Sequence, residues 1–191
     1  MSISPRTTAV RNWLLVAAYV AVLFASVPYA RDIVVGLREQ HLLGTSVTLL
    51  YFVAVVGLVY HVLFDVRLSD RIAFLALVLL ALVTGSLILG LAVPEERIHF
   101  LQYGLLAILC RRALAWHLQP RGQVLGAVAL ASAAGVVDEL LQGLTPERVC
   151  DGRDMAINAV AAFLAIVAEE ALHNRLGWLP RKEEDESHLG D

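Results

Sequence analysis

Long apolar runs separated by short polar stretches make up most of the chain. A helix that crosses a membrane needs about 20 mostly apolar residues, and six segments reach or approach that length. The pattern therefore predicts an all-α, polytopic membrane protein with about six transmembrane helices. The expected spans are Trp13–Ala30, Val47–Phe64, Ile72–Val93, Ile98–Leu118, Gln123–Leu144 and Met155–Leu172.

Composition supports the same class. Of the 191 residues, 58% are hydrophobic and 17% are charged, against roughly 25% charged in soluble domains. A soluble protein of this size could not bury so much apolar surface. We expect one transmembrane domain over residues 1–178, followed by a disordered, acidic cytoplasmic tail over 179–191. Basic residues form no stripe, so nucleic acid is not an expected partner.

The distribution of basic residues predicts the orientation. Short loops on the cytoplasmic side of a membrane carry an excess of Lys and Arg. With the N-terminus inside, ten of the 15 basic residues fall in inner loops. Both termini are therefore predicted to be cytoplasmic, in a plasma or inner membrane. The topology also separates Cys150, outside, from Cys110, toward the inside, so both are expected to be unpaired structural thiols.

Polar residues of the fourth and fifth spans fall near the outer face in this topology. His99 and Tyr103 are four residues apart and so share one face of a helix. Asp138 and Glu139 lie near the outer end of the fifth span, and Gln142 follows one turn after Asp138. Charged groups inside a membrane are costly and are usually paired or functional.

The sixth span adds polar residues at the same end. Arg148 lies in the preceding loop, and Asp154 and Asn158 share a helical face. Taken singly, Asp154 could cap the helix, Asn158 could bond a neighbouring helix, and the acids could pair with Arg97 or Arg148. Together the three helix ends predict one cluster of carboxylates, an imidazole and a guanidinium. Such a cluster suits a general acid or base, a hard-metal site or a phosphate clamp, so the cofactor stays open.

The polar motifs resemble those of the VanZ-like family. The strings E-R-I-H-F-L-Q-Y-G, D-E-L-L-Q and R-V-C-D-G-R-D-M-A-I-N are similar to its H-F-x-x-Y, D-E-x-x-Q and R-x-x-D-x-x-D-x-x-x-N. The resemblance covers the core at about 94–168. It departs at Ala161 and Ala165, where relatives often have glycine. The family is linked to low-level resistance to the glycopeptide antibiotic teicoplanin, so the resemblance implies a cell-envelope setting more than a reaction.

Three hypotheses follow. In the first, the cluster binds or acts on a membrane lipid or a lipid-linked envelope precursor at the outer leaflet. In the second, the same residues staple the helices of a scaffold without enzymatic activity. The third, an ion-coupled transporter, is disfavoured because no polar residues line a path inward. For the first hypothesis, the catalytic candidates are His99, Asp138 and Glu139, and the binding candidates are Arg97, Tyr103, Gln142, Arg148, Asp154 and Asn158.

Overall fold

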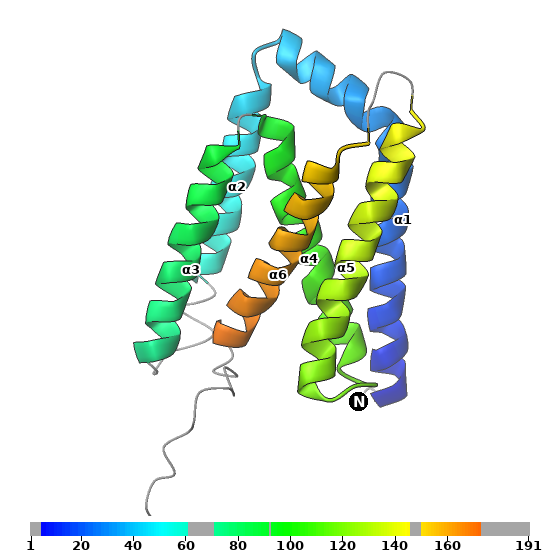
Figure 1. Ribbon diagram of the computed structural model, residues 1–191, viewed down its shortest axis with the longest axis vertical. Coiled ribbons are helices and arrows are strands. Elements are labelled where there is room, and N and C mark those ends of the chain that lie inside the picture. The colour runs from blue at the N-terminus through cyan, green and yellow to red at the C-terminus, as the bar shows by residue number, and fades with distance from the viewer. Residues whose placement is uncertain (1–4, 61–70, 92, 146–149, 173–191) are drawn as a thin grey trace, which may run out of the picture.

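Six helices form the part of the chain that the structure describes. The computed structural model describes residues 5–60, 71–91, 93–145 and 150–172. Helices and short connections account for all of these residues, which confirms the predicted all-α class (Figure 1). The predicted tail over 179–191 lies outside the described residues. The helices are α1 Pro5–Glu39, α2 Leu43–Tyr60, α3 Arg71–Gly90, α4 Pro94–Leu114, α5 Pro120–Gly143 and α6 Gly152–Leu172.

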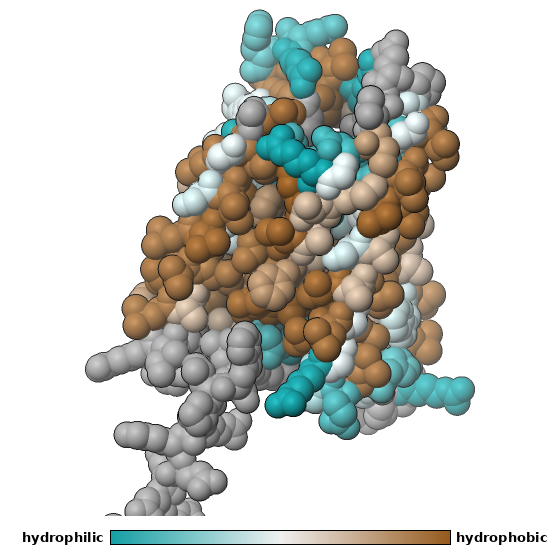
Figure 2. Space-filling view, in the orientation of Figure 1, coloured by the Kyte–Doolittle hydropathy of each residue, from teal (hydrophilic) through white to brown (hydrophobic). Residues whose placement is uncertain are grey.

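The outer surface of the bundle is apolar, as a lipid-facing surface must be. Within the described ranges, α1, α2, α5 and α6 are long and apolar enough to cross a membrane. The apolar part of α3 is shorter, and α4 carries charged residues at both ends. Figure 2 shows apolar side chains over the middle of the molecule and polar ones toward its two ends. The protein is therefore a helical membrane protein.

Helix α1 is longer than the apolar pattern predicts. The expected span ends at Ala30, whereas the helix continues to Glu39 and contains Pro28. Proline removes one backbone hydrogen bond and bends a helix. In Figure 1 the last part of α1 crosses the end of the bundle toward α2. Residues 31–39, which were expected to form a loop, are thus helical. Charged residues end the apolar run there, but they do not end the helix.

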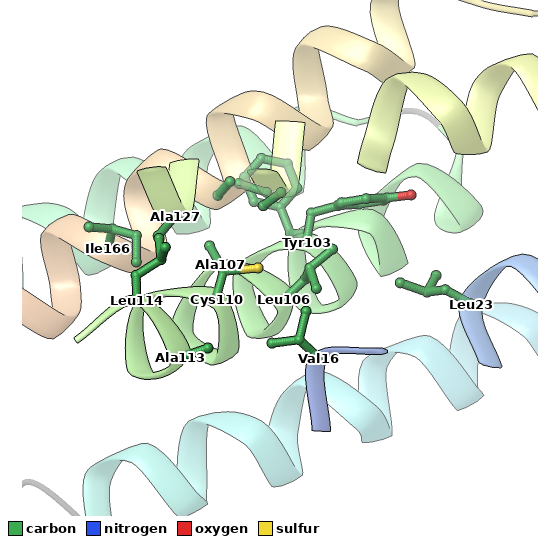
Figure 3. Packing of buried hydrophobic residues seen from close by; sticks show 14 of the residues in the cluster. Val16, Leu23, Tyr103, Leu106, Ala107, Cys110, Ala113, Leu114, Ala127 and Ile166 are labelled. Atoms are coloured by element: carbon green, nitrogen blue, oxygen red, sulfur yellow. The ribbon is translucent and has the colours of Figure 1, made fainter. Parts of the chain in front are cut away.

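Helix α4 lies at the centre of the bundle and packs against α1, α2, α5 and α6. Its buried face from Tyr103 to Leu114 forms the middle of the apolar core (Figure 3). Two tyrosines tie neighbouring helices to its backbone. The Tyr19 hydroxyl donates to the carbonyl of Gln102 at 3.1 Å, and the Tyr51 hydroxyl donates to the carbonyl of Arg97.

Small residues let α4, α5 and α6 approach closely. A Cβ atom at Gly104 would lie 3.3 Å from the Cβ of Ala165, and one at Gly135 would lie 2.8 Å from the Cβ of Asn158. Close backbone approach at small residues is a common way to associate helices in membranes. The start of α4, the end of α5 and the start of α6 therefore meet at one end of the bundle.

Candidate functional site

Three ionisable side chains meet where α4, α5 and α6 converge. One side-chain atom each of His99, Glu139 and Asp154 lies within 4.8 Å of the other two. Each residue comes from a different helix. The Tyr103 ring contacts the His99 ring edge to face, with 6.0 Å between the ring centroids. Residues from three separate motifs of the sequence thus form one group, which is called the carboxylate–histidine cluster below.

A small pocket lies next to His99, which forms part of its lining. Its polar wall consists of His99 and Gln102 on α4 with Asp138 and Gln142 on α5. The amide of Gln142 donates to the Asp138 carboxylate at 3.0 Å. The pocket has a volume of about 80 Å³, enough for several water molecules or one small chemical group. Its apolar wall is completed by Leu23, Ser26, Val27, Ala30 and Val34 of α1, and by Ile98.

Several buried polar atoms around the cluster lack a hydrogen-bond partner among the described residues. They are Nδ1 of His99, one carboxylate oxygen of Asp154 and both amide atoms of Asn158. Tyr103 and Asn158 are completely buried. Buried polar groups in proteins nearly always have a partner. A site of this kind can hold water, an ion or a polar ligand.

The start of α6 is capped by Asp151, not by Asp154. The Asp151 carboxylate accepts the backbone N–H of Arg153 at 2.8 Å, which is the usual contact of an N-cap residue. The backbone N–H of Asp151 in turn donates to the Glu139 carboxylate at 3.4 Å. The Asp154 side chain is consequently released from capping and lies in the cluster.

Arg97 and Arg153 contact groups outside the cluster. The Arg97 side chain donates to the carbonyl of Leu91 at 2.8 Å, and Arg153 pairs with Glu96 at 3.1 Å. Within the described ranges, neither Asp138 nor Asp154 forms an ion pair with an arginine. The predicted binding residue Arg148 lies outside those ranges. The structure therefore does not contain the predicted alternative in which Arg97 pairs with Asp138.

A second polar cluster lies near the opposite end of α4 and α6, and the sequence patterns did not single it out. Arg111 is buried and its guanidinium pairs with both Glu169, at 3.1 Å, and Glu170. Arg112 lies 3.9 Å from Glu169 and is largely exposed. The available signal was the Arg-Arg pair in one apolar span and the Glu-Glu pair in another. We refer to Arg111, Glu169 and Glu170 as the arginine–glutamate cluster.

Comparison of the chain with protein-family models, with curated proteins and with solved structures found no match. The resemblance to the VanZ-like family therefore stays a prediction that rests on the motifs.

Proposed function

We propose that this protein binds an envelope lipid or a lipid-linked envelope precursor at the extracytoplasmic ends of its last three helices. The proposal includes six transmembrane passes with both termini in the cytoplasm. The observation that carries it is the pocket between α1, α4 and α5, which has one apolar wall and one polar wall. Glycopeptide resistance, which the motif resemblance suggests, would follow if that lipid belongs to cell-wall assembly.

The two walls of the pocket suit the two parts of a lipid. The α1 side consists of Leu23, Val27 and Ala30 with their neighbours, all on one helical face. The opposite side presents the Asp138 carboxylate and the Gln142 amide. Acyl or prenyl chains would follow α1, while hydroxyl or amine groups of the head group would donate to Asp138. Ligand sites of this kind combine a mostly apolar lining with a few convergent polar groups.

The scaffold alternative is less well supported, because the chain already contains a cluster with the properties of a staple. In the arginine–glutamate cluster, a buried guanidinium meets two carboxylates across α4 and α6. At the other end of the same helices, Asp154 forms no ion pair and the Asn158 side chain forms no hydrogen bond among the described residues. Residues retained only to join helices would be expected to satisfy one another.

The ion-coupled transporter is also not favoured. Between the two polar clusters, residues 104–110 of α4 read GLLAILC and residues 159–168 of α6 read AVAAFLAIVA. Neither stretch contains an ionisable side chain other than the buried thiol of Cys110. An ion path along this interface would lack the polar groups that proton and ion relays use.

Blocking the pocket tests the proposal. Ala30 lies in the pocket lining, and Ala25 is an exposed residue of the same helix outside that lining. Ala30→Trp should fill the pocket and reduce lipid retention about tenfold or more, equivalent to at least about 1.4 kcal/mol of binding. Native mass spectrometry of protein purified in mild detergent measures the retained lipid.

The matched variant Ala25→Trp adds the same side chain to the outer surface and should retain lipid like the wild type. Equal retention by both variants would refute binding in this pocket. A wild-type chain that carries no lipid, together with normal folding of all three proteins, would refute the proposed function itself.

The orientation has a separate test. Cys150 is exposed and precedes α6, whereas Cys110 is buried in the core and should stay unreactive whichever side it faces. A membrane-impermeant maleimide should therefore label Cys150 in intact cells. In a Cys150→Ser background, Gln119→Cys at the exposed α4–α5 connection should label only after permeabilisation. The opposite pattern would reverse the topology.

A further inference from the structure

We propose that His99, Glu139 and Asp154 form a binding site for a divalent transition-metal ion, which goes beyond the proposed lipid binding. The observation is the approach of an imidazole nitrogen and two carboxylate oxygens within 4.8 Å of one another at the junction of three helices. One nitrogen and two oxygen ligands match the preferences of Zn²⁺ and Mn²⁺ better than those of Ca²⁺ or Mg²⁺, which favour oxygen alone.

The spacing of the three ligand atoms is close to what a metal ion requires. Zinc binds His nitrogen and carboxylate oxygen at about 2.0–2.2 Å, so ligand atoms around it lie roughly 3.3 Å apart. A separation of 4.8 Å or less closes by small rotations of side chains on helices that are already packed together. Three protein ligands would also leave a coordination position open, as in catalytic metal sites.

The surrounding side chains give an independent reason to expect a ligand here. The Tyr103 side chain is completely buried, contacts the His99 ring, and lies near the Asp138 and Glu139 carboxylates. Its hydroxyl interacts with the Asp138 carboxylate. In Figure 3 this hydroxyl points away from Ala107, Cys110 and Ile166 and toward the side on which Leu23 lies. Both amide atoms of Asn158, which follows Asp154 by one turn of α6 and is completely buried, have no hydrogen-bond partner in the described part of the chain. A metal-bound water would provide the missing partner.

The charge of the region supports a cation over an anion. Asp138, Glu139 and Asp154 bring three carboxyl groups to one end of the bundle. Neither Asp138 nor Asp154 is paired with an arginine in the described ranges. Unpaired carboxylates away from bulk water are costly. A divalent ion would offset the charge of Asp154, and the Asp151 N–H would orient Glu139 from outside the ligand set.

Metal occupancy and thermal stability test the site with Zn²⁺ as the probe. The full chain in mild detergent is freed of metal with a chelator, equilibrated with Zn²⁺, desalted and measured by plasma mass spectrometry. The wild type should bind about one Zn²⁺ per chain and unfold at a higher temperature with Zn²⁺ than without it. Asp154→Asn and His99→Gln should each lower the affinity at least roughly tenfold and abolish the thermal shift.

Two matched variants control for adventitious binding. His117→Gln removes a histidine at the opposite end of α4, and Asp32→Asn removes an exposed acid of α1. Both should bind Zn²⁺ like the wild type. Binding that survives in both Asp154→Asn and His99→Gln, or that is lost in the controls, would overturn the site. If one of the two cluster variants fails to fold, the other decides.

The metal test and the lipid test fail separately. Zn²⁺ is measured without added lipid, and Ala30→Trp replaces none of the three ligands, although His99 also lines the pocket that it fills. Ala30→Trp should therefore keep its Zn²⁺ while losing lipid. A chain that retains lipid but binds no Zn²⁺ would leave the proposed function standing and remove the metal site.

Discussion

Replacing Arg111 with methionine should lower the free energy of unfolding by about 3–5 kcal/mol. Only 5% of Arg111 is exposed, and its guanidinium contacts both Glu169 and Glu170, which are themselves buried. Methionine fills a similar volume but leaves two buried carboxylates without their counterion. In a protein of this length, the change corresponds to a fall in Tm on the order of 10 °C, measurable by thermal unfolding in detergent.

The neighbouring residue provides the control. Arg112 is 64% exposed and lies 3.9 Å from Glu169, so Arg112→Met should change stability by less than about 1 kcal/mol. Adding Glu169→Gln and Glu170→Gln to Arg111→Met should recover part of the lost stability, because the buried charges are then gone. Equal stability of the two single arginine variants would show that the guanidinium of Arg111 is not the staple of α4 and α6.

Replacing Glu139 with glutamine should remove ligand binding while leaving the fold intact. Glutamine has nearly the same shape and keeps an oxygen for the Asp151 N–H, which donates to Glu139 at 3.4 Å. It lacks the charge that holds a cation or a charged group. The loss of a hydrogen bond to a charged group corresponds to about a tenfold to a hundredfold drop in affinity. Native mass spectrometry of both proteins in mild detergent measures the retained metal.

The opposite end of the bundle supplies a matched variant. Glu170→Gln makes the same chemical change in the arginine–glutamate cluster, where Glu170 pairs with Arg111. For Glu170→Gln we expect a changed Tm, whereas the retention of the ligand should stay the same as in the wild type. If Glu139→Gln instead unfolds earlier and loses metal only in proportion to lost folded protein, the carboxylate–histidine cluster joins helices and does not bind a metal ion.

In our proposal, the two clusters divide binding and stability between the two ends of α4 and α6. The arginine–glutamate cluster joins the end of α4 to the end of α6. The carboxylate–histidine cluster lies at the end where the two helices meet α5, next to the Asn158 side chain, whose amide atoms have no partner among the described residues. Polar groups left unsatisfied in a low-dielectric site carry a cost that a bound ligand can offset.

The sequence by itself determined the class of the protein and the neighbourhood of the site. Apolar runs report burial or lipid contact residue by residue, so they located all six helices without any tertiary information. Helical spacing also placed His99 with Tyr103, and Asp154 with Asn158, on shared faces. The same spacing could not show that Asp151 caps α6, because capping depends on where the helix begins and not on hydropathy.

For two adjacent residues of the same or a similar type, only the tertiary structure decided which neighbour each residue faces. Consecutive residues of a helix point about 100° apart, so the rotation of each helix about its axis sets their roles. Packing directs Asp138 toward the α1 pocket and Glu139 toward His99 and Asp154. It likewise buries one arginine of the pair at the end of α4 and leaves the next exposed. Such contacts arise from the joint fit of several helices, which no local stretch of sequence contains.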